Sequence, residues 1–204
     1  MNLALSAIFR TLQASAPAEQ WQSQRERVES GLNHLLRFAD DLEKVAQVAK
    51  SPWHPFDLVA ATHDAITGLN GGLGLAVTFE PDAELPGLIG HRAHFTLVVI
   101  NLLRNAAQNN PRPGASATLR ACHSAARDAV ELSIDDNGPG VPEEHREEIF
   151  RRGFALRPGG SGQGLALVRE VVEREMRGAV RCESSPLGGA RFVLSFPIAP
   201  KENS

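Results

Sequence analysis

Residues 130–140 read VELSIDDNGPG, an alternating segment followed at once by a glycine-rich turn. Apolar Val130, Leu132 and Ile134 alternate with polar residues, which is the pattern of a strand with one buried face. Asp136 continues the apolar parity, so the pattern predicts that its carboxylate points toward the core. The stretch therefore predicts a half-buried strand over 129–135, followed by a turn that is either structural or ligand-binding.

The segments on both sides of this strand alternate between helical and strand periodicity. Helices are predicted over residues 56–69, 91–109 and 163–176, and strands over residues 75–80 and 117–123. A hairpin with a turn at 186–189 closes the chain, and its apolar residues are Val180, Cys182, Phe192, Leu194 and Phe196. This order predicts an α+β fold, a two-layer α/β sandwich in which helices cover one face of a mixed sheet.

The first quarter of the chain has a different composition. Helices are predicted over 2–14 and 18–50, and a proline-containing linker follows at 51–55. The second helix carries an apolar stripe formed by Val28, Leu32, Leu35, Phe38, Leu42 and Val45. We expect residues 1–51 to form a helical hairpin domain and residues 52–204 a second domain. The hairpin cannot bury its stripe alone, so it either dimerises into a four-helix bundle, which we favour, or packs on the second domain.

The composition of the 204 residues is that of a globular protein, with 42% hydrophobic residues and a net charge of −3. This charge argues against general binding of nucleic acid. The sequence has no apolar run of about 18 residues and no signal-peptide pattern, so we expect a cytoplasmic location without a membrane segment. Cys122 and Cys182 are too few for a disulfide framework or a cysteine-rich zinc site, and both are expected to be buried thiols.

Three amides share one face of the helix predicted over 91–109. Asn101, Asn105 and Gln108 are spaced i, i+4 and i+7 among apolar residues. Such amides cost desolvation energy unless they find partners, so three on one face indicate a polar site. Asp136 adds a carboxylate that needs a donor, which the exocyclic amine of a purine would supply.

A second glycine-rich segment, GSGQG at residues 160–164, opens the helix predicted over 163–176. Free N–H groups at the start of a helix bind phosphates. The dinucleotide-binding fingerprint requires a strand directly before its glycines, but residues 151–158 have a loop-like sequence. The lysine of a P-loop is also absent, so neither of these two nucleotide folds fits.

Four segments in order resemble the motifs of the histidine-kinase ATP-binding domain. NLLRNA at 101–106 resembles its N box, DNGPGVP at 136–142 the first glycine box, IFRRGF at 149–154 the phenylalanine box and GSGQGL at 160–165 the second glycine box. Asn105 lies 31 residues before Asp136, and Gly160 follows Asp136 by 24 residues, as in that family. The resemblance covers residues 56–198 and implies the cofactors ATP and Mg²⁺.

The resemblance also implies the role of each matching residue. Asn105 matches the asparagine that coordinates Mg²⁺ between the ATP phosphates, and Asp136 matches the aspartate that binds the adenine amino group. The other implied nucleotide-binding residues are Asn101, Gly138, Gly140, Val141, Gly160, Ser161, Gly162, Gln163, Gly164 and Leu165. The glycines of both boxes are expected to hinge a lid over residues 141–161.

Gln108 differs from the residue that many members of the family have, and Asn101 differs from the residue that the family's hydrolysing relatives have. Gln108 stands where many members have lysine, so one phosphate-facing charge is missing, and Arg157 in the lid is expected to supply a cation instead. Asn101 stands where the hydrolysing relatives gyrase and Hsp90 place a glutamate that activates water. Because an amide cannot act as that base, Asn101 is expected to be a catalytic-site residue that favours phosphoryl transfer over hydrolysis.

The N-terminal hairpin resembles the dimerisation and phosphoacceptor domain of the same family. Residues 5–8 resemble the end of the phosphoacceptor box, which would place its histidine before residue 1. His34 is the single histidine among residues 1–50, matches no motif, and is expected to be an ordinary surface residue. We therefore expect this chain to lack an acceptor histidine of its own.

The resulting hypothesis is the catalytic core of a sensor histidine kinase of a two-component system. It would form a homodimer through residues 1–50 and transfer the γ-phosphoryl of Mg-ATP to a histidine, for relay to the aspartate of a response regulator receiver domain. Two alternatives stay open, a non-catalytic phosphotransfer or docking module with the same fold and a serine kinase of the anti-sigma type. The intact glycine boxes speak against the first alternative, and the helical hairpin speaks against the second.

Overall fold

The computed structural model describes residues 53–69, 73–111, 113–157 and 160–198. The hairpin domain predicted over 1–51, with its apolar stripe and His34, lies outside these residues. In the part of the chain that is described, none of the helices combines the length and apolar character needed to cross a membrane.

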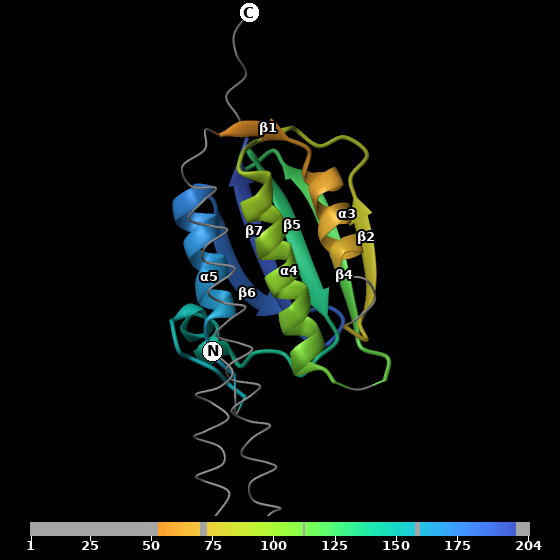
Figure 1. Cartoon of the computed structure of the whole chain (residues 1–204), viewed down its shortest axis with the longest axis vertical. Helices are drawn as coiled ribbons and strands as arrows, with labels where there is room; N and C mark the ends of the chain where they lie inside the picture. The colour runs from red at the N-terminus through yellow and green to blue at the C-terminus, as the bar shows by residue number, and fades with distance from the viewer. Residues whose placement is uncertain (1–52, 70–72, 112, 158–159, 199–204) are drawn as a thin grey trace, which may run out of the picture. The chain divides into compact units, whose positions relative to one another are not determined.

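A five-stranded mixed sheet is the frame of the described domain (Figure 1). Its strand order is β2-β4-β5-β7-β6, with β2 parallel to β4 and every other pair antiparallel. The strands are β2 Ala76–Pro81, β4 Ser116–Ser124, β5 Ala129–Asp136, β6 Ala179–Ser184 and β7 Ala190–Pro197. The predicted strands and the closing hairpin are confirmed, and β5 lies in the centre of the sheet.

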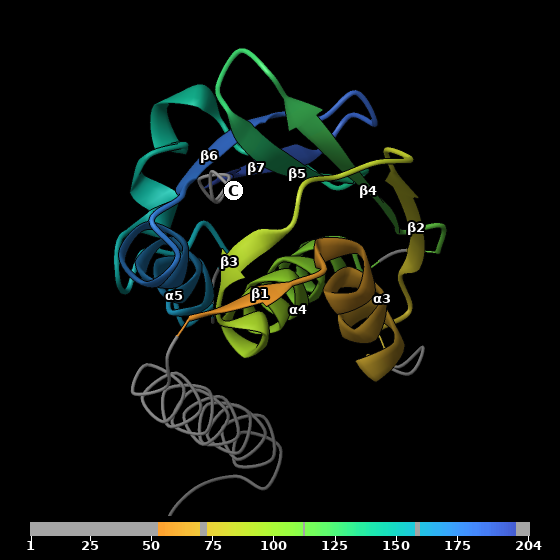
Figure 2. The ribbon, with the colours of Figure 1, turned by 90° about the horizontal axis from the view of Figure 1, so that it is seen from above.

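Helices cover one face of this sheet, as Figure 2 shows from above. They are α3 Leu58–Gly68, α4 Arg92–Asn109, α5 Gly164–Glu170 and its π-helical continuation η3 Val171–Glu175. The predicted two-layer α/β sandwich is thus confirmed. The helix predicted as one element over 163–176 instead changes pitch at Val171, whose carbonyl accepts from the N–H of Met176 five residues on (3.0 Å).

Helix α4 packs its apolar side on the centre of the sheet. Five of its apolar residues are at most 1% exposed: Phe95, Val98, Val99, Leu102 and Leu103. They share one core cluster with the inward-facing Leu132 and Ile134 of β5. Burial of each such side chain contributes roughly 1.5–3 kcal/mol, so α4 is firmly fixed to the sheet. Its polar face is therefore held at a defined place beside the end of β5.

Two small predictions were wrong. Residues 54 and 55, predicted as linker, and Phe56, predicted as helix, form β1 (His54–Phe56), which pairs antiparallel with β3 (Leu88–Gly90). Pro55 fits there because proline is tolerated in an edge strand. Cys182 is buried as predicted, and burial raises the pKa of its thiol to about 12. Cys122 is exposed instead, because it shares the helix-free face of β4 with Arg120.

Candidate functional site

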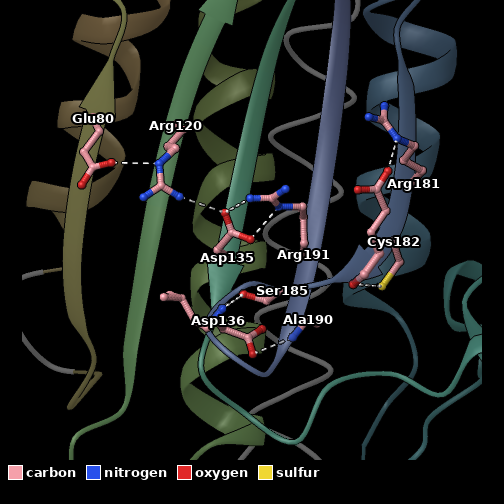
Figure 3. Close-up of polar contacts among 11 residues, drawn as sticks. Glu80, Arg120, Asp135, Asp136, Arg181, Cys182, Ser185, Ala190 and Arg191 are labelled. Carbon is pink, nitrogen blue, oxygen red and sulfur yellow. Dashed lines mark hydrogen bonds and ion pairs between the residues drawn. The ribbon is translucent and has the colours of Figure 1, made fainter.

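Asp136 ends β5 and has the strand parity of the core residues Leu132 and Ile134. Its Oδ1 accepts hydrogen bonds from the backbone N–H of Gly138 (2.9 Å) and from that of Ala190 on β7 (3.0 Å; Figure 3). The residue is only 7% exposed, which confirms the predicted inward orientation. Both bonds end on Oδ1, so Oδ2 keeps the capacity to accept from a ligand amine.

The environment of Asp136 raises the pKa of its carboxyl group. Burial raises the pKa of this carboxyl above its ordinary value, the N–H groups of Ala190 and Gly138 oppose the increase, and the negative charge of Asp135 adds to it. Asp136 is therefore protonated at a higher pH than a surface aspartate. Any ligand that depends on an ionised Asp136 will bind less tightly as the pH falls through this raised pKa.

Asn137 ties the turn after β5 to the neighbouring elements. Its Oδ1 accepts from Nδ2 of Asn110 (2.7 Å) and from the N–H of Ser116 (2.9 Å), while its Nδ2 donates to the carbonyl of Gly114 (2.9 Å). Asn110 directly follows α4 and is 3% exposed, and Ser116 begins β4. No role was predicted for Asn137 from the sequence, although an amide can both donate and accept at such a junction.

The glycines near Asp136 are required by close contacts. A Cβ on Gly138 would lie 2.9 Å from Asp136 Oδ1, and a Cβ on Gly140, where φ is +74°, would lie 3.3 Å from the carbonyl oxygen of Gly189. A Cβ on Gly189 itself would lie 2.1 Å from Asp136 Oδ1. Gly189 was predicted only as part of the hairpin turn, and the doubled glycine at 188–189 was the only sequence signal of this close contact. Val141, after the first glycine box, is half-buried against the core.

One of the predicted amides of α4, Asn101, lies beside the second glycine box. Nδ2 of Asn101 donates to the carbonyl of Leu97 (2.9 Å), and its Oδ1 lies 3.4 Å from the place of a Cβ on Gly164. One turn on, Oδ1 of Asn105 accepts from Nδ2 of Asn109 (2.8 Å). The structure therefore brings the N box and the second glycine box together.

The second glycine box rests on the loop that precedes it. This loop contains the short 3₁₀ helices η1 Glu143–His145 and η2 Glu148–Phe150. The N–H of Gly153 donates to the carbonyl of Gly162 (3.1 Å), and a Cβ on Gly162, where φ is +62°, would lie 2.5 Å from the carbonyl carbon of Gly153. Ser161 is exposed, and its Oγ accepts from the N–H of Gln163 (3.4 Å).

Three further predicted site residues border this box. A Cβ on Gly160 would lie 2.9 Å from the Cβ of Ala155, and Leu165 packs on the core. The guanidinium of Arg157 donates to the backbone carbonyl of Gln108 near the end of α4. The expected cation thus lies beside the position where the family's lysine is missing.

The described residues hold no group of three or more His, Cys, Asp or Glu side chains placed to bind a metal ion. A nucleotide-bound Mg²⁺ needs less from the protein, because it takes one or two protein oxygens and completes its shell with phosphates and water. Oδ1 of Asn105 is an oxygen of this kind, on a half-buried residue of the helix face that also carries Asn101. The residues therefore fit a magnesium ion that arrives with a nucleotide.

Comparison with known proteins gives a family match over the whole site. The model described as "Histidine kinase-, DNA gyrase B-, and HSP90-like ATPase" matches residues 90–200, more than half of the chain. The match runs from β3 through α4, both glycine boxes and the closing hairpin.

Curated relatives with similar sequences are sensor kinases. The chain is 28% identical over 209 residues to the sensor histidine kinase CpxA of Escherichia coli (strain K12), covering 97% of this chain and 43% of CpxA. It is 34% identical over 179 residues to the sensor-type histidine kinase PrrB of Mycobacterium tuberculosis (strain H37Rv), covering 84% of this chain and 37% of PrrB. The chain therefore spans less than half the length of these relatives.

Solved structures agree with this assignment. The ATP binding domain of PrrB from Mycobacterium tuberculosis matches with a TM-score of 0.60 and 34% identity, over 73% of this chain and 99% of that chain. The histidine kinase ThkA, solved in complex with the response regulator protein TrrA, shares the fold with a TM-score of 0.70 and 20% identity, over 97% of this chain and 57% of that chain. The chain belongs to the histidine kinase, gyrase B and HSP90-like ATPase family and contains the ATP-binding catalytic domain of a histidine kinase.

Proposed function

We propose that this chain is the catalytic core of a sensor histidine kinase, which binds Mg-ATP and transfers its γ-phosphoryl group to a histidine. The observation that carries the proposal is the carboxylate of Asp136. It is buried at the end of the central strand and accepts two backbone N–H groups on one oxygen. Its other oxygen is suited to accept the amino group of adenine, which guanine does not offer at that position.

The remaining residues of the boxes contact different parts of the nucleotide. Gly138 and Gly140 let the backbone lie against the base, with Val141 beside them. The N–H groups of residues 160–165 meet the phosphates at the start of α5. Arg157, which now donates to the carbonyl of Gln108, exchanges that acceptor for a phosphate oxygen when ATP is present.

Asn101 and Asn105 direct the reaction from α4. Asn105, whose Oδ1 now accepts from Asn109, would hold Mg²⁺ through that oxygen, and the ion would supply positive charge beside the phosphates. Asn101 has no basic atom with which to activate water, so hydrolysis is disfavoured. Transfer to a protein acceptor requires positioning and charge neutralisation more than covalent chemistry, and the site supplies both.

The proposal includes two protein partners. A second copy of the chain would pair with the first through residues 1–50, and the receiver domain of a response regulator would accept the phosphoryl group. The support is that the similar CpxA and PrrB are sensor kinases and that ThkA was solved with the response regulator TrrA. Such a core works in the cytoplasm, where ATP is available.

Titration calorimetry of Asp136→Asn tests the nucleotide part of the proposal. The substitution should weaken ATP binding by roughly tenfold to a hundredfold, because the acceptor for the adenine amine becomes an amide of mixed character. GTP binding should change little. The fold should survive, because Oδ1 of asparagine can still accept from Gly138 and Ala190. Asp64→Asn is the matched control, since Asp64 is an exposed aspartate that pairs with Arg92 far from the boxes along the chain. Equal ATP affinities for the parent and D136N proteins would contradict the assignment.

The transfer step is tested with γ-labelled ATP. A longer version of the chain, extended upstream to include a complete phosphoacceptor box, should gain acid-labile label in the presence of Mg²⁺, whereas the chain of 204 residues should not. Label on the shorter chain that disappears in His34→Ala would show that the hairpin was wrongly interpreted. Absence of label on both versions, with ATP bound, would favour a non-catalytic module.

A further inference from the structure

Asp135 and Asp136 are adjacent on β5 and engage two adjacent residues of β7, Arg191 and Ala190, from opposite faces of the sheet. On the helix-free face, Arg191 donates from Nε to Oδ1 of Asp135 (2.6 Å) and from its terminal nitrogen to Oδ2 (2.9 Å; Figure 3). On the helix-covered face, the N–H of Ala190 donates to Asp136 (3.0 Å). The dipeptide 135–136 of β5 is therefore bonded to the dipeptide 190–191 of β7 by an ion pair on one face of the sheet and a hydrogen bond on the other.

Asp135 requires its ion pair with Arg191 because its carboxylate is fully buried. Its exposed fraction is 0%, although the face on which it lies has no covering helix. Arg191 covers it, and Arg120 approaches to 3.5 Å while pairing with Glu80 (2.9 Å). A buried carboxylate is tolerated only when it is paired, and a bidentate guanidinium pair permits little sliding. The pair thus fixes Asp135 opposite Arg191 in the register of β5 and β7.

On the helix-covered face, where Asp136 lies, the close contact between β7 and the Asp136 carboxylate leaves no room for β7 to move. Gly189, directly before Ala190, already brings its backbone so close that a Cβ would lie 2.1 Å from Asp136 Oδ1. A shift of β7 along β5 would either break the bond from Ala190 or push this carboxylate aside. The register that the outer ion pair sets is therefore the register that Asp136 needs.

We propose that Arg191 and Asp135 are positioning residues for the nucleotide base, holding the start of β7 so that the Asp136 carboxylate faces the adenine amine. The inference rests on the proposed role of Asp136. Neither Arg191 nor Asp135 touches the nucleotide, since both side chains lie on the face of the sheet opposite to α4. Removal of either should change how Asp136 binds ATP without changing the phosphate side of the site.

The same pair also affects the charge of Asp136, on top of the larger effect of burial. The negative charge of Asp135 raises the pKa of Asp136, and Arg191 neutralises Asp135 at hydrogen-bond distance. Other titratable or charged groups near this end of the sheet are Cys182 and Glu183 on β6 and Arg146; Arg146, Asp136 and Glu183 all act on the pKa of the Cys182 thiol. They stay the same in the variants below, so shifts in pH dependence report on the pair.

Two substitutions with opposite expected signs test the proposal by calorimetry of ATP and GTP binding between pH 5 and 8. Arg191→Gln leaves the charge of Asp135 uncompensated and loosens β7, so ATP affinity should fall by about tenfold at pH 7. Its acid-induced loss of ATP affinity should also move to higher pH. Asp135→Asn keeps an acceptor for Arg191 but removes the negative charge, so the acid-induced loss should move to lower pH. A merely structural pair would not shift the two profiles in opposite directions.

The matched control is Arg181→Gln, another arginine on the helix-free face, which pairs with Glu183 (2.6 Å) on β6. This control should bind ATP as the parent does. Circular dichroism verifies folding, and if R191Q does not fold, Arg191→Lys keeps the charge but loses the planar fork. R191K should then bind ATP more weakly with the acid-induced loss at the parent's pH.

Each result decides between the proposal and its alternatives. Folded R191Q or R191K with the ATP affinity and ATP-to-GTP preference of the parent, or D135N with an unshifted pH profile, would overturn it. A parent chain that binds no ATP would instead refute the proposed function. ATP binding that weakens in D136N, but in neither R191Q nor D135N, would refute the positioning role alone.

Discussion

The two glycine boxes of this domain are held in different ways. The first is built into the sheet, because Asp136 and Asn137 bond to β7, to the start of β4 and to the residue after α4. The second depends on backbone contact with its own loop, from Gly153 to Gly162, and on the reach of Arg157 to α4. The first glycine box, the proposed base side, is therefore preformed by the core, whereas the second, the proposed phosphate side, can adjust when the loop moves. Substitutions on the base side should be the more damaging.

Gly189→Ala should have the largest effect. Its Cβ would lie 2.1 Å from Asp136 Oδ1 and 2.5 Å from the nitrogen of Gly138, so either β7 or the carboxylate must move. Calorimetry should show ATP affinity reduced by about a hundredfold or more. Gly87→Ala is the control, because a Cβ there meets no atom within 4 Å. Folded G189A with the parent's ATP affinity would show that the base side is not preformed.

Gly162→Ala should cost less, because its clash is with the adjustable loop. A Cβ there would lie 2.5 Å from the backbone of Gly153, and φ is +62°. Gly153→Ala shares the positive φ (+79°) but meets no atom, so it isolates the conformational cost of roughly 1–2 kcal/mol. Relative to G153A, G162A should lose about tenfold in affinity for ATP and GTP alike. Equal losses in the two variants would mean that contact with the loop is unimportant.

Asn105→Ala should weaken nucleotide binding only when Mg²⁺ is present. An effect of several-fold, on the order of 1 kcal/mol, is expected from the loss of one oxygen ligand among several. Asn109→Ala removes the side chain that now bonds Oδ1 of Asn105, and as a surface change it should stay within about twofold of the parent. Titrations with and without Mg²⁺ compare the two variants. A loss in N105A that is equal without Mg²⁺ would argue against metal binding by Asn105.

Arg157→Gln should have the smallest effect. The arginine is exposed and its contact is with the backbone of Gln108, so its pairing with a phosphate is worth at most about 1 kcal/mol. ATP affinity should fall by a factor of about two to five at low ionic strength, and the difference should vanish in high salt. A loss that persists in 1 M salt would assign Arg157 a structural rather than an electrostatic role.

The parts of the fold that follow from local patterns could be predicted from the sequence. The period of two in Val130, Leu132 and Ile134 defines β5, and the apolar helix over 91–109 corresponds closely to α4. The features that were missed depend on neighbours distant in sequence. β1 exists because β3, more than thirty residues on, supplies its partner, and the exposure of Cys122 follows from the helices covering only the other face.

The same distinction applies to the site. Asp136 and the box glycines could be found because each motif is continuous in the sequence. The roles proposed for Gly189, Arg191 and Asp135 depend on the pairing of β5 with β7, whose hydrogen-bonded partners here lie 54 and 56 residues apart in the sequence. Asp135 was predicted as a polar residue of an exposed face, and it is buried because Arg191 and Arg120 cover it. Alternation in a strand indicates which face a residue occupies but not what lies over that face.

A crystal structure of the chain with Mg²⁺ and a non-hydrolysable ATP analogue tests the central claim most directly. The adenine amine should lie within hydrogen-bond distance of Asp136, whose bonds from Gly138 and Ala190 should be unchanged. The metal should contact Oδ1 of Asn105, and residues 153–157 and 160–164 should move more than the turn after β5. An adenine bound away from Asp136, or a displaced Ala190 beside an unmoved loop, would contradict both the assigned site and the preformed base side.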